Sequence, residues 1–150
     1  MTTLVLNHCG RPVPRKFVHF CLGSFTQALK SKRLLRGGQD KELVVVFVDE
    51  AQARSLNRQY RKKDYATDVL SFESQEPESF GELVLCLDVV RRQARDHRLS
   101  VKEELSYLLL HGLLHLLGFD HEKDQKAAKR MFALQDLIWN AFWSRQGRSK

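Results

Sequence analysis

The amino-acid sequence predicts an α+β (mixed α/β) fold, in which a sheet of about four strands packs with about five helices in a single domain, residues 1–150. Three observations support this fold class. The length suits one domain that is large enough to bury a core. Short apolar runs alternate with longer stretches of helical periodicity. Their order along the chain is strand, helix, strand, helix, strand, strand and then three helices.

The first three predicted elements are a strand at Thr3–Leu6, a helix at Pro14–Arg33 and a strand at Leu43–Val48. The helix is indicated by apolar residues at helical spacing, with its proline near the first turn. A glycine pair, Gly37 and Gly38, then breaks the chain. The continuous apolar run of the second strand indicates burial on both faces. If the two strands are parallel, a right-handed crossover joins them.

The next helix is predicted to start at Asp49, because Gln52 completes a capping box with it. We expect this helix to bury Ala53, Leu56 and Tyr60, and a polar loop, Arg61–Ala66, to follow it. The later strands are predicted at Asp68–Phe72 and Glu82–Leu87, with a turn at Ser74–Ser79 between them.

The last three helices have clear start signals or apolar stripes. Asp88 is predicted to cap a helix that continues through Arg98. Ser100 and Glu103 form a second capping box at the start of the next helix. The final helix is indicated by an amphipathic stripe. Its members are Met131, Leu134, Leu137, Ile138, Ala141 and Phe142.

The segment 111–121 contains the strongest functional signal, three histidines at fixed spacing. His111 and His115 are four residues apart, which places them on one face of the predicted helix. Gly118 can end that helix in the left-handed conformation and return the chain, so that His121 approaches the same point. Three imidazoles with a fourth position open are typical of catalytic zinc sites. The sequence therefore predicts one Zn²⁺ per chain, bound by His111, His115 and His121.

The spacing matches the metzincin pattern H-E-x-x-H-x-x-G-x-x-H at each ligand and at the glycine, which predicts a metalloprotease-like metal site. The glutamate of that pattern is the general base of peptide hydrolysis. Gly112 occupies its position here. This difference disfavours a peptidase, which would need another acid that reaches the metal-bound water.

Charge and composition further narrow the classes of protein to which the chain can belong. The net charge is +7, and residues 1–48 contain eight Lys and Arg against two acids. Such a basic surface is typical of nucleic-acid binders, although a solvated basic face without a partner fits the charge equally well. No apolar stretch reaches the roughly 20 residues of a membrane span, and no secretory signal is recognisable, so no membrane partner is expected. Three cysteines without a C-x-x-C pair suit reduced thiols and a cytoplasmic location.

The chain resembles the YbeY family of metal-dependent endoribonucleases, also called rRNA maturation factors. Three segments carry the resemblance, and together they fall within residues 43–142. They are Asn57–Phe72, Gly81–Leu85 and His111–His121. The last one meets the motif H-G-x-x-H-L-x-G-x-D-H in full. One small departure is Glu82, where the family usually has aspartate.

The resemblance implies a single-strand-specific endoribonuclease that acts in 3′-end maturation of ribosomal RNA and in ribosome quality control. Its partners would be ribosomal RNA and ribosomal particles, with ribosomal proteins or an assembly GTPase as further candidates. The family's arginine falls on Arg61, whose planar fork suits the charge that builds on a phosphoryl group. Lys62 and Lys63 would follow the RNA backbone. Tyr60 and Tyr65 are alternative rings for stacking on an unpaired base, with a core position favoured for Tyr60.

Two questions stay open on sequence alone. The first is whether the chain is instead a non-catalytic ribosome assembly factor whose metal is structural. The second is the general base, because Gly112 has no side chain. A metal hydroxide that needs no base, a neighbouring acid such as Glu73 or Glu82, and the 2′-hydroxyl of the RNA are alternative routes. Asp120 is expected either to orient the neighbouring histidine or to fix the turn.

Overall fold

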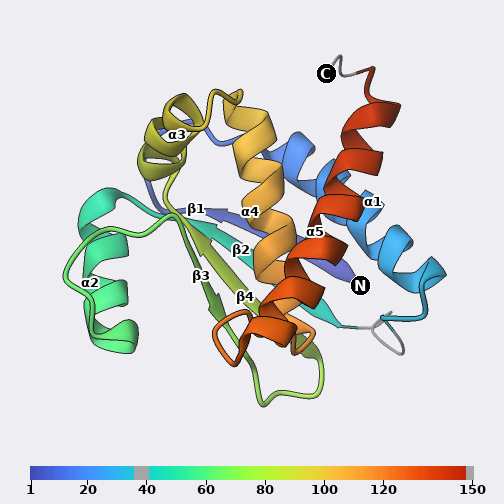
Figure 1. Ribbon diagram of the computed structural model, residues 1–150. Coiled ribbons are helices and arrows are strands. Elements are labelled where there is room, and N and C mark those ends of the chain that lie inside the picture. The colour runs from blue at the N-terminus through green and yellow to red at the C-terminus, as the bar shows by residue number, and fades with distance from the viewer. Residues whose placement is uncertain (36–40, 148–150) are drawn as a thin grey trace.

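The computed structural model describes residues 1–35 and 41–147, so the predicted break at Gly37 and Gly38 lies outside the described residues. Within those ranges the chain forms four strands and five helices in the predicted order, which confirms the α+β fold class (Figure 1). The strands are β1 (Thr2–Asn7), β2 (Glu42–Phe47), β3 (Val69–Phe72) and β4 (Ser79–Leu85). The helices are α1 (Arg15–Ser31), α2 (Glu50–Arg61), α3 (Leu87–Asp96), α4 (Val101–Leu116) and α5 (Gln125–Arg145).

The strands form one mixed sheet in the order β1-β2-β4-β3. β1 and β4 both pair with β2 in parallel, which confirms the parallel arrangement considered for the first two strands. β3 pairs antiparallel with β4 and forms one edge of the sheet. α4 packs against β3 and β4. This helix contains His111 and His115, two of the predicted metal ligands.

The sheet separates two apolar cores. On one face, Val45, Phe47 and Leu83 pack with residues of α1, α4 and α5 in the larger core. On the other face, Val46 and Val84 pack with α2 in a smaller core. Figure 1 shows the same division, with α2 on the side of the sheet away from α4 and α5. Burial on both faces explains why β2 reads as a continuous apolar run.

α4 is the central helix of the larger core. It begins with the predicted capping box, in which Ser100 Oγ accepts from Glu103 N at 3.1 Å and Glu103 Oε1 accepts from Ser100 N at 3.0 Å. It contacts α1, α3 and α5 as well as the sheet. Two tryptophans attach α5 to it, because Trp139 Nε1 and Trp143 Nε1 both donate to Ser106 Oγ, at 3.0 and 2.9 Å.

The predicted buried face of α2 was partly wrong. The Asp49–Gln52 capping box and the burial of Ala53 are confirmed. Tyr60, however, is 56% exposed, and its ring meets Phe72 edge-on, at 5.1 Å between ring centroids. Asn57 is buried instead, and its Nδ2 donates to the carbonyl of Tyr65 at 2.9 Å. A polar residue is buried there because it holds the following loop, which an apolar pattern does not reveal.

Two other predictions near helices need correction. Asp88 does not cap α3, because the helix begins at Leu87 and Cys86 occupies the cap position. The Asp88 carboxylate lies in the first turn and pairs with Arg11 Nη1 at 2.9 Å. In the predicted stripe of α5, Met131, Ile138 and Phe142 are buried, Leu134 is partly buried, and Leu137 and Ala141 are exposed. Gln135 and Trp139 occupy that buried face instead, because both make hydrogen bonds to α4.

The three cysteines are unpaired. Cys21 and Cys86 are buried, and Cys9 is partly exposed at the end of β1. Burial raises the pKa of the Cys21 thiol to about 12 and also raises the pKa of Cys86. Among the described residues, no helix combines the length and apolar character that a membrane crossing requires.

Candidate metal and active site

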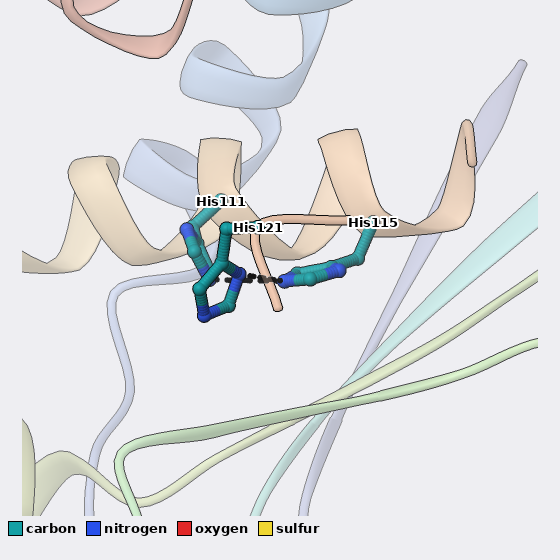
Figure 2. A group of neighbouring side chains, drawn as sticks. All are labelled: His111, His115 and His121. Carbon is teal, nitrogen blue, oxygen red and sulfur yellow. Dashed lines mark hydrogen bonds between the residues drawn. The ribbon is translucent and has the colours of Figure 1, made fainter. Parts of the chain in front are cut away.

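The three histidines of the motif converge on one point. His111 and His115 extend from one face of α4, and His121 reaches them from the loop after it (Figure 2). His115 Nε2 lies 3.1 Å from His111 Nε2 and 3.1 Å from His121 Nδ1. One ring nitrogen from each histidine falls within 4.8 Å of the other two. We call these residues the His triad.

The end of α4 explains how His121 reaches the helix face. Gly118 has φ +98°, a left-handed conformation that side chains disfavour. The amide of Gly118 donates to the carbonyl of His115 at 3.0 Å, and the amide of Phe119 donates to the carbonyl of Leu114 at 3.1 Å. This pair of bonds is a Schellman motif, as predicted from the glycine. Asp120 fixes the turn that follows, because its Oδ1 accepts from Glu122 N at 2.9 Å.

The donor set fits a divalent transition metal. A tetrahedral zinc ion bound at 2.0–2.1 Å holds two ligand nitrogens about 3.3 Å apart. The separations of 3.1 Å within the His triad are close to this value. Three half-buried imidazoles are therefore positioned to bind a metal ion, and imidazole ligands suit zinc as well as copper, iron and nickel.

A buried glutamine orients one of the rings. Gln135 of α5 is fully buried, and its Nε2 donates to the carbonyl of Tyr107 at 3.3 Å. Its Oε1 is then free to accept from His111 Nδ1, at 3.1 Å. Because Nδ1 carries the proton, the Nε2 lone pair of His111 faces the centre of the His triad. This role could not be predicted from the sequence, because Gln135 lies on a separate helix.

The His triad is electrostatically suited to bind a cation. Burial lowers the pKa of His111, and His121 lowers it further, although the hydrogen bond that His111 donates to Gln135 acts in the opposite direction. Burial and the neighbouring His111 and His121 rings lower the pKa of His115 to about 4. Both imidazoles are therefore neutral at pH 7, which is the form that binds a metal.

Gly112 lies where α4 packs tightly against Leu83 and Ser71 of the sheet. A β-carbon at this position would lie 2.6 Å from Leu83 Cδ2 and 3.2 Å from Ser71 Oγ. A glutamate between the two ligand histidines would require Leu83 to shift. Packing therefore disfavours, at this position, the peptidase base that the metzincin pattern requires.

The His triad opens into a cavity of about 920 Å³. Among the predicted functional residues, Arg61 and Lys63 line this cavity with the His triad, and Lys62 does not. Arg61 is the last residue of α2, and its charge contributes to the lowered pKa of His115. Lys62 has φ 61° and ends the helix in the left-handed conformation. Tyr65 lines the cavity with 54% of its surface exposed.

Two contacts hold the loop that carries Lys63 and Tyr65. The first is the bond from buried Asn57 to the carbonyl of Tyr65. The second is a two-pronged ion pair, in which Arg54 Nε and Nη2 donate to the Asp64 carboxylate at 2.8 and 3.0 Å. These contacts with α2 therefore hold the loop in place as part of the cavity wall.

The cavity wall also contains residues that sequence reasoning missed. Phe132 of α5 is stacked on His111, at 6.1 Å between ring centroids, and contacts His121. Three acids near the His triad line the cavity, namely Asp68, Asp120 and Glu122. Glu73 and Glu82, the acids suggested by the sequence, are absent from its lining. Asp120 and Glu122 flank His121 in the chain, and Asp120 was already considered from the sequence. The positions of Phe132 and Asp68, in contrast, depend on how α5 and β3 pack beside α4.

Comparisons with known proteins agree with this site. A family model described as endoribonuclease YbeY matches residues 15–143. A protein named endoribonuclease YbeY from Bdellovibrio bacteriovorus is 46% identical over 140 residues, which cover 93% of each chain. Another of that name from Staphylococcus aureus is 43% identical over 122 residues, covering 72% of this chain and 77% of the relative.

One solved structure has the same fold. The solution structure of TM1509 from Thermotoga maritima matches with a TM-score of 0.63 and 28% sequence identity, over 98% of this chain and 97% of that chain. The family match runs from the start of α1 into α5 and includes the whole His triad. This chain belongs to the endoribonuclease YbeY family.

Proposed function

We propose that this protein is a metal-dependent endoribonuclease that cleaves single-stranded RNA, and that it acts in 3′-end maturation of ribosomal RNA and in ribosome quality control. The observation that carries the proposal is the His triad opening into the cavity that Arg61 and Lys63 also line, in a chain of this family. A metal centre beside two cations suits a phosphodiester, which is negatively charged in the ground state and more so during cleavage.

His111, His115 and His121 are the proposed ligands of one Zn²⁺ ion. A zinc ion bound there would supply an acidified water and polarise a phosphoryl oxygen. Gln135 keeps His111 in the tautomer that binds metal. The choice of zinc rests on the all-nitrogen donor set and the open fourth position.

Arg61 is the proposed catalytic cation. Its guanidinium can donate two parallel hydrogen bonds to phosphoryl oxygens, which the ammonium of lysine cannot do. Lys63 on the same wall would contact the RNA backbone, and Lys62 would do so from outside the cavity. The exposed ring of Tyr65 would stack on an unpaired base, which favours single strands over duplexes.

Cleavage of a labelled single-stranded RNA, with and without a chelator, tests this proposal. We expect His111→Ala to lose both bound metal and cleavage. Arg61→Ala should keep its metal and lose about 100-fold or more in cleavage rate, as expected for the loss of one group that stabilises developing charge. Metal content is measured on the same samples.

Matched controls are available outside the cavity. His8 is exposed, and Arg145 lies at the far end of α5, 20 residues from its first residue. His8→Ala and Arg145→Ala should cleave like the wild type. Full metal-dependent cleavage by His111→Ala would refute the proposal. If the wild type binds metal and ribosomal particles but cleaves nothing, the chain is instead an assembly factor with a structural metal.

We also propose a cellular location and partners for the protein. We place the protein in the cytoplasm, in keeping with three unpaired cysteines. Ribosomal RNA in ribosomal particles would be its partner, with ribosomal proteins or an assembly GTPase as further contacts. One domain, residues 1–150, would contain the whole activity.

A further inference from the structure

The cavity extends past the His triad to a second cluster of polar and aromatic residues. This cluster consists of Gln93 and His97 from the α3 region, Glu104 and Tyr107 from α4, and Trp139 from α5. Glu104 precedes His111 by seven residues, which is two turns of one helix face, or about 10 Å. An RNA whose phosphate lies at the His triad can therefore place a neighbouring base at this cluster.

Packing of the fold alone does not explain why the Glu104 carboxylate is buried. It is 2% exposed, yet it faces the cavity. Its Oε1 accepts from His97 Nδ1, and its Oε2 accepts no hydrogen bond from any residue in the described parts of the chain. A buried carboxylate oxygen without a donor is costly. The hydrogen bond from His97 uses only one oxygen of the Glu104 carboxylate, so the second oxygen is available to a ligand.

A carboxylate accepts hydrogen bonds and cannot donate them. Guanine is the RNA base that presents two adjacent donors, N1–H and N2–H₂, on one edge. Adenine and cytosine place an acceptor nitrogen beside their amino group, and uracil flanks its single donor with two carbonyls. An acceptor placed against Glu104 would be repelled. The Gln93 amide, which has no side-chain partner among the described residues, can donate to guanine O6.

We propose that Glu104, with Gln93, forms a subsite selective for guanine in single-stranded RNA. The surface of Tyr107 and Trp139, whose rings meet edge-to-face at 5.5 Å between centroids, forms the apolar part of this subsite. The inference rests on the proposed ribonuclease function and adds the base that is read next to the cut. It assigns to Glu104 a role in specificity, separate from the His triad.

Binding of mononucleotides to the wild-type protein tests the subsite without cleavage. GMP, AMP, CMP and UMP are titrated separately, and binding is followed by calorimetry. We expect GMP to bind about tenfold more tightly than the other three, the discrimination typical of a two-bond base contact. Equal affinities for the four nucleotides would overturn the proposal, and this comparison requires no variant that could fail to fold.

Glu104→Gln then tests the residue itself, because glutamine keeps the shape and replaces one acceptor with a donor. We expect its GMP preference to disappear, whereas Glu76→Gln, an exposed acid outside the cavity, should keep it. Cleavage of RNAs that differ only in guanine or adenine beside the cut should change in the same way. A Glu104→Gln protein with intact guanine preference would refute the assignment.

The two proposals can fail separately. If the wild type prefers GMP but cleaves no RNA, the ribonuclease proposal fails and the guanine site remains. If it cleaves guanine-free and guanine-containing RNA equally and binds all nucleotides alike, the subsite fails and the ribonuclease proposal remains.

Discussion

At the scale of single residues, Gln135 links the His triad to the packing of α5. It is one of a few buried polar side chains, and each of its two polar atoms has one partner, the Tyr107 carbonyl and His111. Such a fixed amide cannot rotate without losing both bonds. The orientation of His111 is therefore set by the fold before any metal binds.

We expect Gln135→Leu to weaken metal binding about 10- to 100-fold, the usual effect of losing a partner of a ligand histidine. Competition with a chromophoric chelator measures this affinity. The matched control is Gln146→Leu at the C-cap of the same helix, because Gln146 is exposed and its side-chain amide donates to the Phe142 carbonyl, away from the His triad. Unchanged affinity in Gln135→Leu would show that the glutamine does not orient the ligand.

The His triad could be predicted from the sequence because its members lie within eleven residues of one helix and its turn. Their geometry follows from helical spacing and a glycine, which are local rules. Gln135, Phe132 and Glu104 could not be predicted in this way. Their roles depend on which faces of α4 and α5 meet, and no local pattern contains that information.

At the scale of elements, the contact between α4 and the sheet controls the position of two ligand histidines. Gly112 lies between them at the point where the helix touches Leu83. A side chain there must displace the end of the Leu83 side chain or push α4 away from β4. A shift of the helix would move His111 and His115 together relative to Arg61.

Gly112→Ala is therefore expected to destabilise the protein by about 1–3 kcal/mol, the usual cost of overpacking a core. Urea denaturation measures the change. Gly23→Ala is the matched control, because a β-carbon at Gly23 in α1 would have no atom within 4 Å. That variant should be neutral or more stable by up to about 1 kcal/mol. Equal effects at the two positions would contradict the packing argument.

The order of the strands and helices could largely be predicted from the sequence. Both capping boxes start helices where predicted, since a cap is a local hydrogen-bond pattern. The helix faces were less predictable. In α2 and α5, buried Asn57 and Gln135 displace the apolar positions Tyr60 and Leu137 that a hydrophobic stripe places inside. Hydrogen bonds to other segments decide these cases.

At the scale of the whole molecule, the site exists only through the packing of distant segments. The cavity joins the end of α2, the edge strand β3, α4 and α5, which span residues 57–139. Stability of the fold and occupancy of the His triad are therefore coupled, since an ion held by α4 and the following turn stabilises the folded state alone.

We expect the metal-free protein to lose stability as the pH falls from 7 to 5. The folded-state pKa of His115 is lowered to about 4, below the ordinary value of 6.5, so the unfolded chain takes up the proton first. Thermal unfolding at pH 7, 6 and 5 in a chelator measures this loss. His115→Gln should show a smaller pH dependence, and an equally steep one would assign the effect to other groups.

The three cysteine thiols differ in their exposure to solvent. Cys21 and Cys86 are buried with raised pKa values, so neither forms much thiolate near neutral pH. Cys9 is partly exposed, and it lies outside the cavity lining. A maleimide dye should thus attach once per native chain, at Cys9. That provides a fluorescent reporter on wild-type protein, ready for anisotropy measurements of RNA capture without engineering a new attachment point.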